Sequence, residues 1–243
     1  MVFGIKLIRI FLRKYMRLTT LQPAYFPDLE FFWNTAQSDV LVLTDHFQYT
    51  KRSTLTISAP IQLSQPALRI PVRHGNPTLG IWEKRIDPGS NWAKKHLQTI
   101  RHIFNHAPYG YYYYPILKQL LEEHSENLSR FTSDMLIQIF EWLHMDFKVV
   151  FSSQLKHEGT NHDLIVEWCS DLGCDTYIQE TKIFKQKFVD KDILSQSKIK
   201  TKTFAAFPEY HILRSNQKLS ILHFLMQYGP EAGYLLRQYL PSD

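Results

Sequence analysis

The chain has 243 residues, of which 44% are hydrophobic and 14% aromatic, a composition that supports a packed core and excludes a disordered protein. Its net charge is +5, but the first 15 residues hold four basic residues and no acidic one. The remainder balances 24 basic against 23 acidic residues, so we expect no general nucleic-acid-binding surface. No apolar run approaches the roughly 20 residues that a membrane-spanning helix needs.

Residues 1–15 would be apolar on one side and basic on the other if they formed a helix. Lys6 and Arg9 interrupt the apolar stretch and no small-residue cleavage site follows, so a secretory signal is not indicated. One interpretation is a basic amphipathic helix in weak contact with a membrane surface. The other, which we favour, takes Met16 as the true start. Residues 1–15 are then a dispensable leader, and residues 16–243 form a single domain.

The stretch from residue 16 to residue 52 predicts a βαβ unit. Residues 17–22 alternate apolar and polar side chains, as a strand does, and two prolines follow them. Residues 29–36 place apolar side chains at helical spacing, and residues 40–43 form the continuous apolar run of a buried strand.

Further elements follow in chain order. Alternating, β-branched sequence predicts strands over residues 53–58, 67–72 and 80–86. Helical spacing then predicts a helix that Ser90 caps and Pro108 ends, and another that follows the tyrosine run 109–114 and reaches Leu121. The tyrosine run is either a stacking platform or, as we favour, a set of half-buried packing residues.

The second half of the chain again alternates helices and strands. Helices are predicted over residues 127–143, 163–172, 219–228 and 231–240, and strands over residues 146–152, 175–178 and 199–204. This alternation is typical of a layered α/β fold. We therefore expect a mainly parallel sheet with helices on both faces, seeded by the N-terminal βαβ unit, and a more helical C-terminal half.

The cysteines and histidines form no metal-binding pattern. Cys169 and Cys174 are too few for a disulfide framework, so we interpret them as ordinary thiols of a protein in a reducing compartment, the cytoplasm. His102 and His106 have the spacing of two ligands on one helix, but no carboxylate or cysteine completes a set. The sequence predicts no metal site and identifies no cofactor.

A polar cluster directly follows the buried run at residues 40–43. It contains Asp45, Gln48, Tyr49, Lys51 and Arg52. Lysine and arginine at this point suit a phosphate or carboxylate group, and the aspartate suits a general base or an acceptor for sugar hydroxyls. Because open α/β sheets bind ligands at the carboxyl ends of their strands, the cluster predicts a small-molecule site. The alternative is a solvated loop held by salt bridges.

Three further residues are expected at the same edge of the sheet. Gln22 and Tyr25 follow the first strand, which a parallel sheet places beside the second. His96 lies four residues after Trp92, so a core-facing Trp92 directs His96 toward the sheet. We predict Asp45 and His96 as a catalytic acid–base pair, and Gln22, Tyr25, Gln48, Tyr49, Lys51 and Arg52 as substrate-binding residues. The alternative for His96 is an inert, hydrogen-bonded core histidine.

An ordered set of motifs resembles the WbqC-like family. The motifs are residues 22–27 (QPAYFP), 45–52 (DHFQYTKR), 92–96 (WAKKH), 107–109 (APY), 172–177 (LGCDTY) and 219–221 (LSI). Members of that family usually carry an Asn-Arg-rich stretch soon after the Lys-Arg pair, whereas this chain reads STLTISAP at residues 53–60. If the family's stretch binds an anion, this chain either uses Arg69 or Arg73 instead or has changed substrate.

The resemblance implies a role in bacterial surface-polysaccharide (O-antigen) biosynthesis, with which the family is associated. The implied activity is that of a transferase acting on an activated sugar or its donor, so the expected partner is a small molecule such as a nucleotide-activated sugar. The alternative is a non-catalytic binding or scaffolding protein of the same pathway.

Overall fold

The computed structural model describes residues 16–51, 53–63, 65, 67–75, 78–156, 158–181 and 189–241. The predicted leader (1–15) and the predicted ligand-binding residue Arg52 lie outside the described residues.

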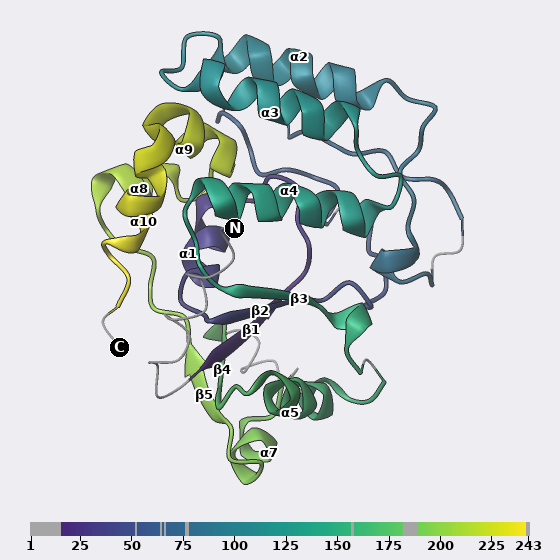
Figure 1. Ribbon diagram of the computed structural model, residues 1–243, viewed down its shortest axis with the longest axis vertical. Helices are drawn as coiled ribbons and strands as arrows, with labels where there is room; N and C mark the ends of the chain where they lie inside the picture. The colour runs from purple at the N-terminus through teal and green to yellow at the C-terminus, as the bar shows by residue number, and fades with distance from the viewer. Residues whose placement is uncertain are drawn as a thin grey trace, which may run out of the picture.

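Five parallel strands form the central sheet, in the order β3-β2-β1-β4-β5 (Figure 1). The strands are β1 (Arg17–Leu21), β2 (Val40–Leu43), β3 (Lys148–Phe151), β4 (Thr176–Gln179) and β5 (Lys200–Thr203). The first two are neighbours, with Leu18 opposite Val40 and Leu21 opposite Leu43. The predicted βαβ unit and the parallel sheet are therefore confirmed.

Nine α-helices are named in the described part of the chain. They are α1 (Leu29–Thr35), α2 (Trp92–Phe104), α3 (Gly110–Glu122), α4 (Leu128–Trp142), α5 (Asn161–Leu172), α7 (Lys191–Gln196), α8 (His211–Asn216), α9 (Ile221–Tyr228) and α10 (Ala232–Arg237). Local sequence accounts for several ends: the Asp28 carboxylate caps α1, the Thr160 hydroxyl caps α5, and Gly173 ends α5 at φ +69°. None of these helices is both long and apolar enough to cross a membrane.

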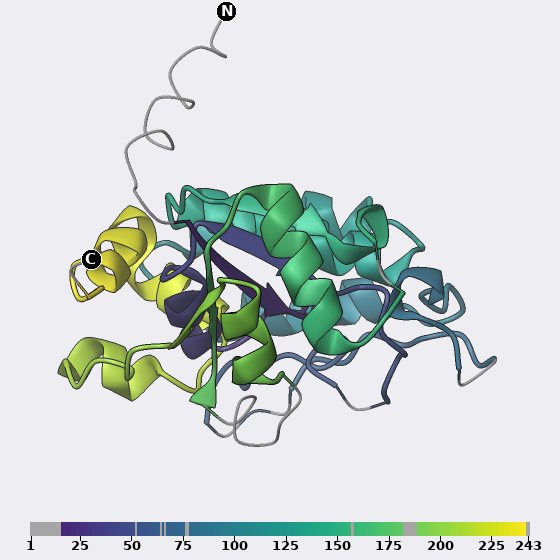
Figure 2. The ribbon, with the colours of Figure 1, turned by 90° about the horizontal axis from the view of Figure 1, so that it is seen from below.

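Strand β2 explains why helices cover both faces of the sheet. Leu41 and Leu43 point into a core shared with α1, α4 and α9, whereas Val40 and Val42 point into a second core shared with α5 and α7. Since side chains alternate along a strand, a strand that is apolar at every position must be buried on both faces. Figure 1 shows α4 above the sheet and α5 and α7 below it, and Figure 2 shows the two lower helices from beneath.

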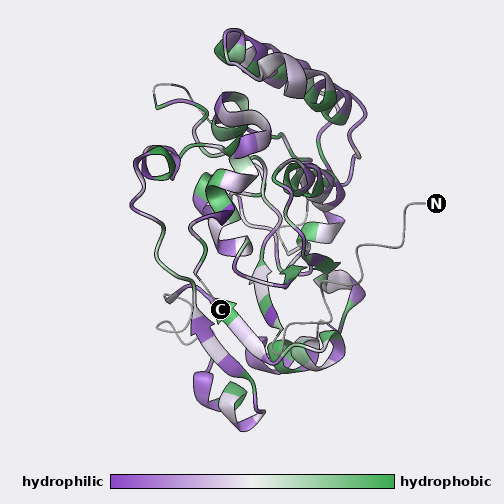
Figure 3. Cartoon of the chain, turned by 60° about the vertical axis from the view of Figure 1, so that its left-hand side comes forward, coloured by the Kyte–Doolittle hydropathy of each residue, from purple (hydrophilic) through white to green (hydrophobic). Residues whose placement is uncertain are grey.

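Helices α2 and α3 pack side by side on the side of α4 away from the sheet (Figure 1). The buried side of α2 carries Trp92, His96, Leu97, Ile100 and Phe104. Hydrophobic and hydrophilic residues alternate along this pair in Figure 3, as expected for helices with one exposed side.

The three strands predicted over residues 53–58, 67–72 and 80–86 are wrong. The chain there is irregular, with the short 3₁₀ helix η2 (Ile81–Glu83) and single antiparallel bridges such as Ile57 to Arg69 and Val72 to Ile86. Prolines interrupt this region, and a proline donates no backbone hydrogen bond to a ladder. Ser90 is also not the cap of α2, because Asn91 precedes its first residue.

Candidate functional site

The segment that follows β2 is held at the carboxyl edge of the sheet by backbone hydrogen bonds to residues 79–82. The amide of Tyr49 donates to the Leu79 carbonyl (3.0 Å), that of Ile81 to Phe47 (2.9 Å), and that of Trp82 to Asp45 (2.9 Å). This pairing lies between segments that are about thirty residues apart in the chain. It places Tyr49 beside Lys84, which is not adjacent to it in sequence.

A cavity of about 730 Å³ opens beside this pairing. Its lining residues are Gln48, Tyr49, Thr50, Lys51, Thr56, Arg69, Ile70, Pro71, Val72, Arg73, His74, Gly75 and Lys84. Two lysines, two arginines and a histidine are among them, and none of these lining residues is acidic. We call this the cation-lined cavity. Its surplus of positive charge suits an anionic ligand.

Lys84 is the least ordinary residue of the cation-lined cavity. Only 6% of its surface is exposed, and its Nζ atom lies 5.1 Å from the centre of the Tyr49 ring. Among the residues that the structure describes, no carboxylate pairs with it. A cation–π contact leaves the positive charge of the ammonium group unneutralised, and Lys84 lines the cavity. The arrangement therefore favours an anion bound from outside.

Arg69 and Arg73 form another part of the cavity wall. The Ile70 amide donates to the Thr56 carbonyl (2.9 Å) and the Arg73 amide to the Arg85 carbonyl (3.0 Å), which fixes the backbone of this wall. Arg73 also pairs with Glu126 at 2.9 Å, but both side chains are about half exposed, so the pair is weak.

Asp45 is 3% exposed and is surrounded by serine side chains. Oδ1 accepts hydrogen bonds from the Ser152 hydroxyl (3.0 Å) and the Ser153 amide (2.9 Å), and Oδ2 from the Ser153 hydroxyl (2.9 Å) and the Ser129 hydroxyl (3.4 Å). The carboxylate thus joins the end of β2 to the residues after β3 and to the first turn of α4. The Ser152 hydroxyl oxygen also lies 2.6 Å from Nδ1 of His46. Ser152 is fully buried, so its hydroxyl is not accessible to a substrate as a nucleophile.

His96 belongs to a different cluster. Its Nδ1 atom lies 2.9 Å from the Tyr25 hydroxyl, and its ring stacks on Tyr25 and meets the edge of Trp92. Burial lowers the pKa of His96 to about 4, against the opposing effect of a hydrogen bond to the Arg69 backbone. Burial also raises the pKa of Tyr25 well above its usual value. Both side chains are therefore neutral at pH 7.

The structure brings together some of the predicted site residues and separates others. Gln48, Tyr49 and Lys51 line the cation-lined cavity, and Arg69 and Arg73, the expected replacements for the Asn-Arg-rich stretch, line it too. Gln22 lines another cavity, on the far side of the segment after β2.

Asp45, His96 and Tyr25 are not among the lining residues of the cation-lined cavity or of the cavity that Gln22 lines. The side chain of Asp45 bonds to serines, and that of His96 to Tyr25 and the Arg69 backbone, so the expected direct pairing of Asp45 with His96 is absent from their described contacts. Catalysis by these two residues stays a prediction.

Sequence reasoning missed Lys84 and His74. Lys84 was placed in a predicted strand, where a charged residue is expected to face solvent. The only signal for it was its position between Ile81 and Ile86, both of which are buried. Periodicity could not show that the chain turns through a 3₁₀ helix at this point and directs Lys84 inward.

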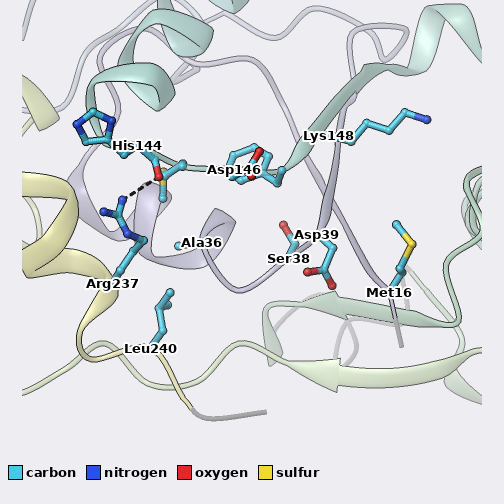
Figure 4. A pocket seen from close by; sticks show the side chains of 11 residues that line it. Met16, Ala36, Ser38, Asp39, His144, Asp146, Lys148, Arg237 and Leu240 are labelled. Atoms are coloured by element: carbon cyan, nitrogen blue, oxygen red, sulfur yellow. Dashed lines mark hydrogen bonds between the residues drawn. The ribbon is translucent and has the colours of Figure 1, made fainter. Parts of the chain in front are cut away.

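A further cavity, of about 650 Å³, lies at the amino edge of the sheet and is drawn in Figure 4. Two of its charged groups have partners: Arg237 donates to the carbonyls of Leu143 and His144 (2.9 Å for His144), and Asp39 accepts from Arg17. Because ligands of open α/β sheets bind at the carboxyl edge, we assign this cavity a packing role.

The two cysteines are buried, and burial raises the pKa of each thiol to about 12. Both are therefore thiols, rather than reactive thiolates, at pH 7. Within the described ranges no three histidine, cysteine or acidic side chains gather as a metal site would require.

Comparison with protein-family models gives a match that covers most of the chain. The model of the WbqC-like protein family matches residues 22–234, a range that includes every described residue of the cation-lined cavity. No curated protein and no solved structure matches the chain.

Proposed function

The chain belongs to the WbqC-like protein family, and from this membership and the cation-lined cavity we propose that it is a transferase of bacterial surface-polysaccharide (O-antigen) biosynthesis. Its substrate is a sugar activated by an anionic group, most simply a nucleotide-activated sugar. The anionic group binds in the cation-lined cavity, against Lys51, Arg69 and Lys84.

Buried, unpaired Lys84 is the observation that carries this proposal. Its side chain packs against Tyr49, its charge has no carboxylate partner among the described residues, and it lines the cavity, so the charge is available to an anionic ligand. A diphosphate would supply the missing negative charge. The amide of Gln48 and the hydroxyl of Tyr49 add hydrogen-bonding groups to the same cavity.

The placement of Asp45 and His96 supports a second candidate, a binding or scaffolding protein of the same pathway that catalyses nothing. Neither residue lines the cation-lined cavity, and no general base is among the described residues that do, apart from exposed His74. Such a protein would hold the activated sugar for another enzyme.

The test is binding followed by turnover. A panel of nucleoside-diphosphate sugars should raise the melting temperature of the full chain, since a ligand at a hundred times its Kd stabilises by about 2.7 kcal/mol. The best binder is then incubated with a bacterial lipid fraction as acceptor, and release of nucleoside diphosphate is measured. Release supports the transferase, and binding without release supports the scaffold.

Lys84→Met separates binding from folding. Met keeps an unbranched apolar side chain but has no charge, so this variant should lose most of the ligand-induced shift. Without ligand it should melt near the wild-type temperature, because no salt bridge to a described residue is lost. Lys94→Met, at an exposed position on α2, is the matched control and should respond like wild type. An undiminished shift in Lys84→Met would contradict the proposed site.

A further inference from the structure

The sheet changes direction between β1 and β4. From β1 the chain adds β2 and then β3 on one side, and it then returns to the other side to add β4 and β5. The connection after β1 runs to α1 on one face, and the one after β4 runs toward α7 on the opposite face. A crevice opens where neighbouring strands send their connections to opposite faces, and open α/β sheets bind ligands in that crevice.

A cavity of about 500 Å³ lies at this point. The ends of β1 and β4 contribute Thr20, Gln22, Tyr177 and Gln179, and α5 contributes Leu164 and Trp168. Figure 1 shows β1 and β4 side by side with α5 beneath them. We call this the switch-point cavity. Of the described residues that the sequence predicted to bind substrate, Gln22 alone lines the switch-point cavity.

The polar floor of the switch-point cavity is held in a fixed arrangement. The Gln179 side-chain amide donates to the Thr20 carbonyl (2.8 Å) and lies 3.0 Å from both the Thr20 and the Tyr177 hydroxyls. These two hydroxyls are 2.8 Å apart, and the Gln179 carbonyl oxygen accepts from the Glu180 amide (3.1 Å). Connected hydrogen bonds of this kind orient each group before any ligand arrives.

The described residues of the two cavities differ in their charged groups. The described residues of the switch-point cavity include no lysine or arginine and one carboxylate, Glu180, whereas the cation-lined cavity has no carboxylate. The described residues of the switch-point cavity therefore offer no cation to pair with a phosphate group. An apolar wall of α5 side chains beside hydroxyl, amide and carboxylate groups instead matches an uncharged ring that carries hydroxyls.

One segment separates the two cavities. Thr44 and Phe47 face the switch-point cavity, and residues 48–51 face the cation-lined cavity. We propose that the switch-point cavity is a binding site for an uncharged, polyhydroxylated ring, the chemistry shared by sugars and nucleosides. This site is independent of the proposed anion site, and together the two hold two substrates, or two parts of one substrate, on either side of residues 44–51.

The experiment is titration of the full chain with uncharged probes, followed by saturation-transfer NMR and calorimetry. Methyl glycosides form one arm, and uridine and adenosine form the other. Binding in the first arm alone identifies a sugar site, and binding in the second alone a nucleoside site. Binding in both supports a site for hydroxylated rings in general. Absence of binding in both arms at millimolar concentration overturns the proposal.

Variants locate the bound probe. Gln179→Met removes the side-chain amide but keeps a side chain of similar length. It should weaken binding of the uncharged probe at least tenfold. Gln22→Trp, which places a bulky side chain at an exposed position of the mouth, should do the same without disturbing the core. Unchanged affinity in either variant, when its melting curve shows that it is folded, overturns the assignment.

The matched control distinguishes this site from the anion site. Lys84→Met should bind the uncharged probe as wild type does but lose affinity for inorganic pyrophosphate, and Gln179→Met should show the reverse. If pyrophosphate does not bind wild type while the uncharged probe does, the proposed function fails and the switch-point site stands.

Discussion

Asp45 and His96 are the residues for which the structure most changes the chemical interpretation. Both are buried polar groups whose described hydrogen bonds go to neighbouring protein atoms, and neither lines the cation-lined cavity or the switch-point cavity. Buried polar groups with satisfied hydrogen bonds contribute to stability, and losing a partner leaves others unsatisfied. Their removal is therefore expected to change folding as well as activity.

Asp45→Asn should lower the free energy of unfolding by about 1–3 kcal/mol. An asparagine amide nitrogen cannot accept the hydrogen bonds that Ser152 and Ser153 donate to the carboxylate. Urea denaturation measures the change. Asp146→Asn, at an exposed position of the turn before β3, is the matched control and should be neutral. An Asp45→Asn variant with wild-type stability and no activity would instead support the predicted catalytic role.

His96 should make stability depend on pH. In the unfolded chain it protonates near pH 6.5, and in the folded chain only near pH 4. Between these values the unfolded state binds more protons, so stability is complete above about pH 6.5 and falls as the pH drops toward 4. The loss is roughly 3 kcal/mol, from 1.36 kcal/mol per pKa unit.

The measurement is the free energy of unfolding from pH 7 to pH 4 in wild type and His96→Gln. The variant should lose less stability over this range, although burial also lowers the pKa of His223, which leaves some dependence in both proteins. Identical pH profiles would show that His96 is not held in its neutral form.

At the scale of elements, helix α10 packs closely against the backbone at the end of α4. A side chain at Gly233 of α10 would overlap the backbone carbonyl of Leu143, the residue after α4. Arg237, one turn further along α10, donates hydrogen bonds to the carbonyls of Leu143 and His144. The glycine therefore allows the arginine to reach the carbonyl groups that end α4.

Gly233→Ala should destabilise the protein although alanine favours helices by about 1 kcal/mol over glycine. The overlap with a backbone group cannot be relieved by rotating a side chain, and overpacking of this kind costs about 1–3 kcal/mol. The melting temperature shows whether the substitution stabilises or destabilises the protein. Gly75→Ala is the control, since an added Cβ there meets no atom within 4 Å. A higher melting temperature for Gly233→Ala would mean that α10 shifts without cost.

At the scale of the whole molecule, β1 is the centre of the sheet and pairs with both β2 and β4. Its position creates the switch point and gives the two proposed ligand sites a shared boundary in residues 44–51. Pairing at the start of β1 includes Met16, whose carbonyl accepts from the amides of Asp175 and Thr176 (3.1 and 3.2 Å). The fold therefore uses the chain from Met16 onward.

A chain that begins at Met16 should keep the melting temperature of the full chain within a few degrees. A chain that begins at Thr19 should melt well below it, because it loses these carbonyl contacts, Leu18 from the second core, and the Arg17–Asp39 pair. Calorimetry of the three proteins tests both statements. A large drop for the Met16 chain would show that residues 1–15 contribute to folding.

Local sequence by itself determined the regular elements and the edge of the sheet at which ligands are expected. The continuous apolar run of β2, the cap Gly173 and the helical spacing of α4 each follow from interactions within a few residues of the chain, so periodicity predicts them. The polar residues after β2 were likewise visible as a site, because a parallel strand ends in a known place.

Only the tertiary structure decided which side chains share a cavity. Residues 53–86 are joined by single long-range backbone hydrogen bonds, which leave no periodic pattern in the sequence. Those bonds bring Arg69 and Lys84 to Tyr49, and the order of the strands brings Gln179 to Thr20. The physical reason is that a contact between distant segments depends on how the whole chain packs. The spacing of residues within one segment carries no information about that packing.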